Sequence, residues 1–403
     1  MTLAKICTLR RYKVVLRTNV GELANEKLMK HSLLILIFLC VGISIHAQKK
    51  KTTEKVVMPI NITSETLNTI QLDSTATFTN YFEGKFFSFT KEGVVVSSDT
   101  NGTVLWKQQV TGSISVQPVL VENILVIATD NNDINTFDIK TGSQLQSISV
   151  EDKITTPLFA FNYAGTNELM IPKQINSKAA VVFGTASGKI SCLDLESLQE
   201  YWQNGDQKDT LYTRPILVNN KLVFTRGDGS LNSIDANTGL RIWRWQEEEL
   251  SNFSKANLET DGKSIFVVSA DSVFHSINFL LGRLNWRLEN IKVDSKFFYS
   301  TSQKNLYLIS RNEKLIIFSV KDEVTVDDFK LRYNLPNNSY NFFECGKKVF
   351  FVYNGTIYEA EEKQLLREVL KLDFADVKSF YQLGENKFAV LSFNGKLTIF
   401  IMR

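Results

Sequence analysis

Residues 229–243 read GSLNSIDANTGLRIW, and this stretch decides the fold. Apolar and polar residues alternate up to Asp235, which is the pattern of a β-strand with one buried face. The next residues predict a tight turn, because Asp235 can accept hydrogen bonds from backbone amides two residues on and Gly239 tolerates a positive φ. Residues 240–245 then return as a second strand that carries Trp243. The stretch therefore predicts a β-hairpin.

Similar hairpins recur along the chain, at 133–146, 188–202 and 272–286. The last residues of the turns provide seven anchors, which are Gly102, Gly142, Leu198, Gly239, Gly282, Glu323 and Gln364. Their spacings are 40, 56, 41, 43, 41 and 41 residues, and an eighth anchor is expected just beyond Arg403. One period near 41 therefore fits the chain, with an insertion of about 15 residues in Asn162–Lys178.

Two more positions keep the phase of the repeat. Four residues before the anchor stand an Asp or Asn, namely Asp138, Asp194, Asp235 and Asn278. Four residues after it stand four of the five tryptophans, namely Trp106, Trp202, Trp243 and Trp286. We expect each indole to fill the wedge between neighbouring sheets, burying about 150–250 Å². Stacking of these rings against a cofactor is the alternative.

The unit has the size of a propeller blade. Residues 221–225, 230–235 and 240–245, with a further strand leading into the next unit, make four short strands in about 40 residues. Eight units predict a single all-β domain over residues 60–403, an eight-bladed β-propeller, with seven blades as the alternative. The last unit reads as two strands, 387–392 and 396–401. We expect the strand-like residues 60–72 to complete this blade and cover its open edges.

The N-terminal region predicts export. An apolar run from Leu33 to Ile45 follows Met29 and Lys30, and a small residue, Ala47, follows the run. This is the pattern of a signal peptide over residues 29–47. Residues 1–28 then form a non-native upstream extension, and residues 48–59 form a tether. The alternative is a membrane anchor, although 13 apolar residues are fewer than the roughly 20 that span a bilayer.

Composition excludes several classes of partner. The chain has 403 residues with 46 Lys and Arg and 43 Asp and Glu. Residues 1–47 hold seven of the basic and two of the acidic residues, which leaves 39 and 41 in the mature chain. A near-neutral mature chain provides no electrostatic reason to expect nucleic acid. No transmembrane segment is expected in the mature chain.

Cys192 and Cys345 are interpreted as two separate buried thiols, with a disulfide between them as the alternative.

The mature chain offers little material for catalysis. Its one histidine, His275, lies in the middle of a predicted strand, so Ser-His-Asp catalysis and multi-histidine metal sites are not expected. The segment Asp130–Asp133 has oxygen ligands suited to calcium, but it lacks the loop glycine and later glutamate of an EF-hand. We interpret this segment as a turn between strands. We predict no enzymatic activity, and no catalytic, cofactor or metal residue.

The pattern D-x-x-T-G-x-x-x-W at Asp235–Trp243 resembles the pyrroloquinoline-quinone (PQQ) repeat of β-propellers. The strand starts Gln117-Pro118, Thr156-Pro157 and Arg214-Pro215 share this resemblance, which covers about residues 80–290. PQQ-dependent dehydrogenases carry the same repeat, but the adjacent-cysteine pair usual in them is missing here. As an exported single propeller, the chain is similar to the propeller subunits of the outer-membrane β-barrel assembly machinery.

That resemblance implies a non-catalytic scaffold at the periplasm or the outer-membrane periphery, a monomer that binds other envelope proteins. Such subunits are usually lipoproteins, whereas Leu39 before Cys40 departs from the lipoprotein signal. Their partner-binding loop residues have no clear counterpart in this sequence. A scaffold predicts an apolar or charged patch on one rim of the ring.

The alternative function is binding of a small molecule or glycan, or a cryptic enzymatic activity, at the central channel. It predicts clustered carboxylates or aromatic residues at one channel mouth, with the insertion near residues 162–178 as a lid. Three or more carboxylates converging in the channel would favour this alternative.

Overall fold

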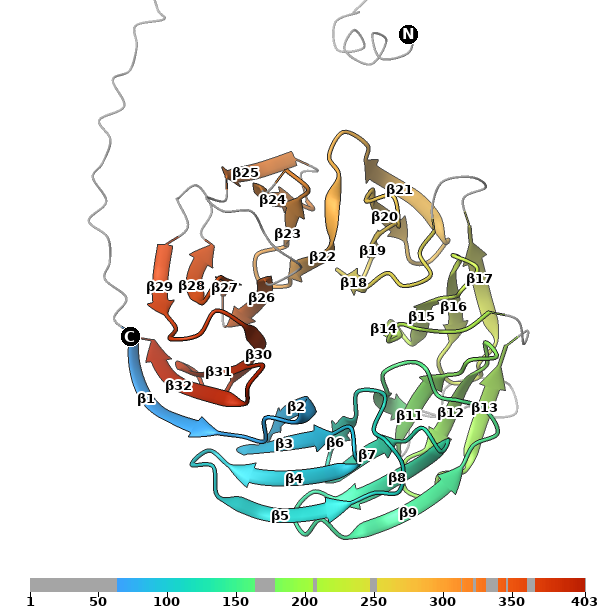
Figure 1. Ribbon diagram of the computed structural model, residues 1–403. Helices are drawn as coiled ribbons and strands as arrows, with labels where there is room; N and C mark the ends of the chain where they lie inside the picture. The colour runs from blue at the N-terminus through green and yellow to red at the C-terminus, as the bar shows by residue number, and fades with distance from the viewer. Residues whose placement is uncertain are drawn as a thin grey trace, which may run out of the picture. The chain divides into compact units, whose positions relative to one another are not determined.

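The computed structural model describes residues 64–163, 178–205, 209–246, 252–312, 314–321, 324–330, 340–345, 347–360 and 367–402, with backbone alone for 324–330 and 345. The predicted upstream extension, signal peptide and tether lie outside these residues, as does most of the insertion between 162 and 178. The described residues form 32 strands in eight antiparallel sheets of four (Figure 1). The sheets are arranged in a ring, which confirms the eight-bladed β-propeller.

We number the blades along the chain and name the four strands of each blade A to D from the channel outward. Blades 1 to 4 comprise, in this order, β2 (Ala76–Phe82), β3 (Lys85–Thr90), β4 (Val94–Asp99) and β5 (Val104–Gln109); β6 (Val119–Val121), β7 (Ile124–Ala128), β8 (Asp133–Asp138) and β9 (Gln144–Ser149); β10 (Phe159–Tyr163), β11 (Lys178–Gly184), β12 (Ile190–Asp194) and β13 (Glu200–Asn204); and β14 (Ile216–Val218), β15 (Lys221–Thr225), β16 (Leu231–Asp235) and β17 (Arg241–Trp245).

Blades 5 to 8 comprise β18 (Leu258–Thr260), β19 (Ser264–Val268), β20 (Phe274–Asn278) and β21 (Arg283–Leu288); β22 (Val293–Ser300), β23 (Asn305–Ser310), β24 (Lys314–Ser319) and β25 (Val324–Lys330); β26 (Tyr340–Cys345), β27 (Lys348–Tyr353), β28 (Thr356–Ala360) and β29 (Arg367–Lys371); and β30 (Val377–Gln382), β31 (Lys387–Ser392), β32 (Lys396–Met402) and β1 (Ser64–Gln71).

The core is divided into eight layers, one between each pair of neighbouring sheets. Strands B and C supply most of it, because both of their faces pack against a neighbouring blade. Strand β7 (ILVIA) and strand β23 (NLYLIS) are almost wholly buried, and both read as apolar runs rather than as alternating strands. Strand D lies at the outside and is mostly exposed, as in β9, where all six residues are exposed.

The tryptophans of strand D lock neighbouring blades together. Trp243 donates a hydrogen bond from Nε1 to the carbonyl oxygen of Phe279 in the next blade, at 2.7 Å. Its ring covers Gly282 in the C–D turn of that blade, where an added Cβ would lie 2.6 Å from Trp243 Cδ2. Gly282 has a φ of 59°, so glycine is favoured there by both conformation and space.

The same contact recurs at two other boundaries between blades. Trp106 donates to Ile139 O at 3.1 Å and covers Gly142, and Trp202 donates to Ala236 O at 2.9 Å and covers Gly239. The prediction that the indoles fill the wedges between sheets is confirmed.

The boundary between blades 2 and 3 lacks both partners of this contact. Gln146 occupies the tryptophan position in β9, and the turn glycine of blade 3 is replaced by Leu198, which adopts a φ of 55°. Leu198 is buried in the layer between these two blades. The leucine side chain therefore occupies space at the boundary that lacks an indole.

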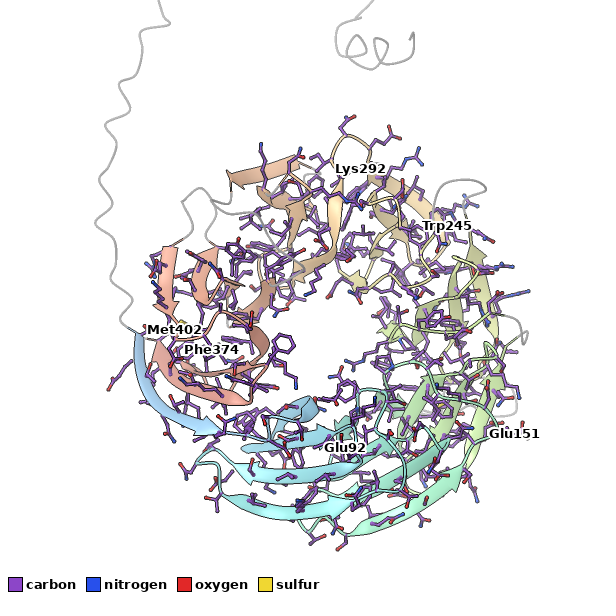
Figure 2. The ribbon with its side chains drawn as sticks, in the orientation of Figure 1. Glu92, Glu151, Trp245, Lys292, Phe374 and Met402 are labelled. Atoms are coloured by element: carbon purple, nitrogen blue, oxygen red, sulfur yellow. The ribbon has the colours of Figure 1, made fainter. Side chains whose placement is uncertain are left out.

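The N-terminal strand closes the ring, as predicted from residues 60–72. Strand β1 pairs antiparallel with β32, from Ser64 opposite Met402 to Gln71 opposite Lys396 (Figure 2 labels Met402 beside β1). Ile70 of β1 lies against Gly102 of blade 1, with the added Cβ position 3.4 Å from Ile70 Cβ. At the boundary between blades 8 and 1, Ile70 therefore covers the turn glycine of the next blade, as Trp106, Trp202 and Trp243 do at their boundaries.

Two details of the strand prediction were wrong. The last unit contributes three strands, because β30 precedes the two predicted ones. The fourth strand of unit four is the short β14 before Lys221, whereas the strand after Trp245, β18, begins the next blade. Both missed strands are A strands beside the channel, and β30 is mostly half-buried without alternation. Pro118, Pro157 and Pro215 precede A strands, where one backbone edge has no partner strand.

Candidate functional site

His275 and Cys192 belong to the framework. His275 lies in β20 and is buried, its Nδ1 is 3.0 Å from Val273 O, and its ring packs edge-on against Phe253 at 5.2 Å. The interpretation as a blade residue is confirmed. Cys192 is a buried free thiol whose pKa is raised by burial, and the side chain of Cys345 lies outside the described part.

Asp130–Asp133 connects β7 to β8, which confirms the interpretation of this segment as a turn between strands. Asp130 Oδ1 accepts a hydrogen bond from the Ser113 amide at 2.6 Å, and Asn132 has a φ of 66°. The carboxylate therefore holds the connection from the previous blade. In the residues that the structure describes, no group of three or more His, Cys, Asp or Glu side chains is arranged to hold a metal ion.

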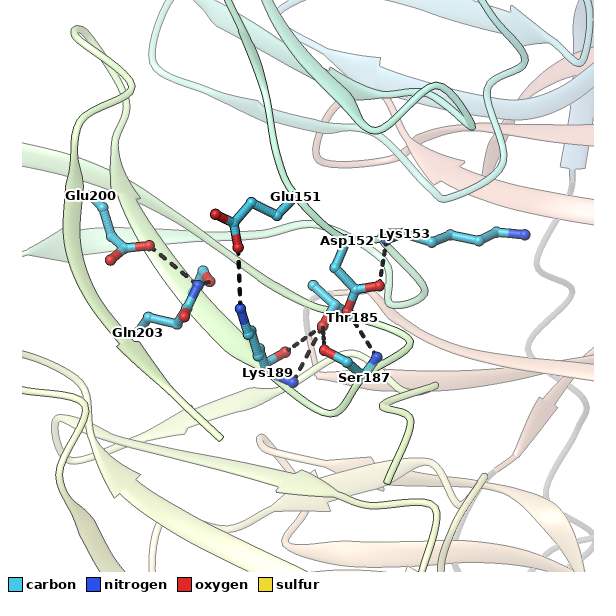
Figure 3. A network of polar contacts seen from close by, with 9 residues as sticks. Glu151, Asp152, Lys153, Thr185, Ser187, Lys189, Glu200 and Gln203 are labelled. Carbon is cyan, nitrogen blue, oxygen red and sulfur yellow. Dashed lines mark hydrogen bonds and ion pairs between the residues drawn. The ribbon is translucent and has the colours of Figure 1, made fainter. Parts of the chain in front are cut away.

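A polar network fixes the connection between blades 2 and 3 (Figure 3). Asp152 accepts a hydrogen bond from the Ser187 amide at 2.8 Å, and Glu151 lies 3.4 Å from Lys189 Nζ. Burial opposes ionisation of Asp152, but hydrogen bonds from Ser187 and Thr185 outweigh it and lower the pKa of the carboxyl group. All these residues join the segment before β10 to the β11–β12 turn. Holding this segment to the turn accounts for the whole network, so the network gives no indication of a binding site.

The C–D turn of blade 5 departs from the repeat in its chemistry while keeping its geometry. In blades 2, 3 and 4 the two residues before the anchor are polar, namely Lys140-Thr141, Glu196-Ser197 and Asn237-Thr238. In blade 5 they are Leu280 and Leu281. Asn278 Oδ1 still accepts hydrogen bonds from both leucine amides, at 3.1 and 3.0 Å. The turn therefore does not require leucine at these positions.

Both leucines face solvent, with 57% and 58% of their surface exposed. Three more exposed apolar residues lie nearby, namely Ile242 and Leu284 on strands D of blades 4 and 5 and Leu240 just before strand D of blade 4. The packing of Trp243 on Gly282 brings these strands and this turn together. We call Leu240, Ile242, Leu280, Leu281 and Leu284 the leucine rim. Exposed apolar residues gathered in one place are typical of docking surfaces.

The central channel holds a cavity of about 690 Å³ between the A strands of blades 3 to 7. Its wall is rich in aromatic side chains, namely Phe159, Phe297, Phe298, Tyr340 and Phe342. Its charged residues are Arg214, Glu259 and Lys296. The aromatic cluster predicted for a ligand-binding channel is therefore present, whereas among the residues that the structure describes Glu259 is the single carboxylate lining this cavity.

Sequence reasoning missed both surfaces. The leucine rim had a visible signal, because FLLG at 279–282 stands where other units have ANTG or IKTG. The channel residues had none, since they come from five blades and from strands as short as the three residues of β14.

The fold and its turns define an eight-bladed propeller built from PQQ-like repeats. A model of one family of such propellers, described as outer membrane protein assembly factor BamB, matches residues 61–204, 165–256 and 186–328. These matches cover more than half of the chain, and the chain belongs to this family.

The relatives are distant. BamB of Shewanella oneidensis is 22% identical over 213 residues, which are 50% of each chain. This chain spans about half the length of the curated relatives it matches. The crystal structure of BamB from Moraxella catarrhalis is similar over 84% of this chain and 97% of that one, with a TM-score of 0.61 and 14% identity.

A quinohemoprotein alcohol dehydrogenase from Pseudomonas putida has a TM-score of 0.62 at 11% identity, over 84% of this chain and 76% of that one. At such identities the structures show the shared fold alone. The part of the chain that the structure describes contains no helix able to cross a membrane.

Proposed function

We propose that this protein is an exported, non-catalytic scaffold that binds other proteins of the cell envelope during assembly of outer-membrane β-barrel proteins. Membership of the BamB family supports the process, and the predicted signal peptide over residues 29–47 supports the compartment. The observation that carries the scaffold role is the leucine rim, where apolar residues replace polar ones in a turn that keeps its backbone hydrogen bonds.

The rim has the properties of a contact surface for a folded partner. Its five residues come from two neighbouring blades whose positions are fixed by the Trp243 contact, so little ordering accompanies binding. Burial of apolar area stabilises by about 25 cal/mol per Å², so burying two exposed leucines contributes several kcal/mol at most. A central apolar patch of this size, with polar surroundings, is a common basis for affinity.

The test is capture of partners by tagged protein from cross-linked cell envelopes, followed by mass spectrometry. Wild type is compared with the double variant Leu280→Ser and Leu281→Ser. The matched control is Val104→Ser with Leu105→Ser, an exposed apolar pair of 58% and 47% on strand D of blade 1. We expect wild type and control to recover the β-barrel assembly machinery and the Leu280/Leu281 variant to lose it. Equal recovery by all three would exclude the rim, and no recovery by wild type would refute the scaffold.

Export is tested separately by measuring the mass of the protein purified from its native cells. Cleavage after Ala47 leaves a chain that starts at Gln48. A mass that includes residues 29–47 would instead support the membrane anchor.

A further inference from the structure

Positively charged side chains surround the leucine rim. The A–B and C–D turns of blades 4 and 5 lie at the same end of their sheets, because neighbouring strands in each blade are antiparallel. A cation stands where each of these four turns leads into the next strand, namely Lys221, Arg241, Lys263 and Arg283. The apolar residues of the rim therefore lie among four basic ones.

Contacts with Phe279, the residue before Leu280, hold two of these cations beside the leucines. The Phe279 amide donates a hydrogen bond to the carbonyl oxygen of Lys263, at 3.1 Å. Lys221 Nζ lies 5.8 Å from the centre of the Phe279 ring. Arg283 directly follows the same turn in the chain. The exposed leucines therefore have one cation of blade 4 and two of blade 5 as neighbours.

Arginine at the start of strand D is a departure from the repeat. Strand D begins with Val104, Gln144 and Glu200 in blades 1, 2 and 3, but with Arg241 and Arg283 in blades 4 and 5. All five strands pair antiparallel with strand C of their own blade. The fold therefore accepts uncharged and acidic residues at this position, and its requirements do not explain the two arginines.

Arg283 and Lys263 keep their charges available. Both are exposed, and within the described part of the chain neither side chain makes an ion pair, a hydrogen bond or a contact with an aromatic ring. The guanidinium of Arg283 has five donors in a planar fork that matches a carboxylate, and the amine of Lys263 has three donors. Both cations are therefore open to the carboxylates of a partner.

The four turns, all of whose residues the structure describes, hold two carboxylates, and the backbone uses both. Asp261 Oδ1 accepts hydrogen bonds from the amides of Lys263 and Ser264, at 2.8 and 2.6 Å. Asp235 Oδ1 accepts hydrogen bonds from two amides of its own turn, both at 3.0 Å. Four cations against two carboxylates leave this part of the surface positive.

This charge favours an acidic protein over two other occupants of the rim. A second copy of the chain docked through the same surface would bring like charges together, which is unfavourable. A flat lipid surface meets the tip of a turn first, whereas the apolar residues continue from Leu281 to Leu284, about 10 Å along the strand at 3.3 Å per residue. A protein surface can follow this shape.

We propose that the leucine rim binds an acidic segment of another protein, whose apolar side chains pack on Leu280 and Leu281 and whose carboxylates contact Arg283 and Lys263. This inference rests on the proposed scaffold function and specifies the chemistry of its partner. Complementary charge around an apolar centre raises the rate of association and disfavours wrong partners.

The experiment places the photoreactive amino acid p-benzoylphenylalanine in the full chain in place of Leu281, in its native cells. After irradiation the adduct is purified, and the attached peptide is sequenced by mass spectrometry. We expect a peptide of another protein that combines apolar residues with more Asp and Glu than Lys and Arg. A neutral or basic peptide, a covalent dimer of this chain, a phospholipid adduct or no adduct would each overturn the proposal.

Charge variants of the same photoreactive chain test the two cations. Lys263→Glu with Arg283→Glu should reduce the adduct about tenfold, because attraction becomes repulsion at two sites. Lys263→Arg with Arg283→Lys keeps both charges and should retain the adduct. The matched control, Lys107→Glu with Lys140→Glu, replaces two exposed cations of blades 1 and 2 and changes the net charge equally. An equal loss in the control, or no loss in the rim variant, would overturn the proposal.

The outcomes separate this proposal from the scaffold function. If the tagged wild type recovers the β-barrel assembly machinery but position 281 forms no adduct with an acidic segment, the scaffold function stands and the acidic partner is refuted. If the wild type recovers no envelope protein and position 281 forms no adduct, both are refuted.

Discussion

The contact between Trp243 and Gly282 makes a quantitative prediction about what holds the blades together. Replacing Gly282 by Ala changes two things at once. The new Cβ must tolerate a φ of 59°, and it would lie 2.6 Å from an indole carbon, which is closer than real Cβ contacts. The residue is buried, so the clash cannot be relieved toward solvent.

The two costs can be estimated separately. A non-glycine residue in the left-handed region costs about 1–2 kcal/mol. Overpacking by one methyl group in a rigid core adds about 1–3 kcal/mol. We therefore expect Gly282→Ala to lower the free energy of unfolding by about 2–5 kcal/mol.

The structure contains a control for the conformational cost. Gly262 has a φ of 84°, and no atom lies within 4 Å of its added Cβ. Gly262→Ala should therefore cost only about 1–2 kcal/mol. Both variants are measured by urea unfolding followed by tryptophan fluorescence and circular dichroism.

The difference between the two variants measures the steric cost alone. A second test combines Gly282→Ala with Trp243→Ala, where the alanine at 282 should cost no more than Gly262→Ala does. Equal destabilisation by Gly282→Ala and Gly262→Ala in the wild-type background would refute the packing of the indole on the turn.

Three further predictions concern other parts of the molecule. Trp202→Phe removes the Nε1 hydrogen bond to Ala236 O and should cost about 1–3 kcal/mol in urea unfolding, whereas a loss below 0.5 kcal/mol would mean that this bond contributes little. The pKa of Glu259 is raised by burial to about 7, so the native state binds the proton more tightly and stability falls as pH rises from about 4.5 to 7. Glu259→Gln should remove that fall in stability, which is on the order of 2 kcal/mol after screening by channel water. Melting temperatures measured from about pH 4.5 to 7 test this, and an equal dependence on pH in the variant and the wild type would contradict it. Among the eight outer strands described, β9 is the one without a charged residue, so Ser147→Lys should delay aggregation on heating, seen by light scattering against the unaltered protein.

The architecture was predictable because its determinants are rare residues at fixed offsets. Asp235 and Gly239 are required by the turn and Trp243 by the wedge, so their spacing revealed the repeat, the number of blades and the closing role of residues 60–72. Strand β30 was missed because an A strand beside a channel is half-buried along its length and shows no alternation.

The surfaces were harder to predict for different reasons. Leu280 and Leu281 stand where the turns of blades 2, 3 and 4 have polar residues. A search for positions at which one unit differs from the others would have found them. Arg214 and Lys296 are 82 positions apart and line one cavity only because the ring brings five A strands together. No local pattern in the sequence indicates that these two residues share a cavity.

The pairing of β1 with β32 also determines when the molecule can become complete. Synthesis proceeds from the N-terminus, so β1 is made before every other strand of the ring and its partner β32 is made after all of them. Until then β1 has no partner strand, and blade 8 consists of β30 and β31 alone. Bringing such distant segments together costs little more than closing a moderate loop, because this entropy grows only with the logarithm of length. A chain that stops before Lys396 would therefore retain most of its blades and still leave the ring open at both edges.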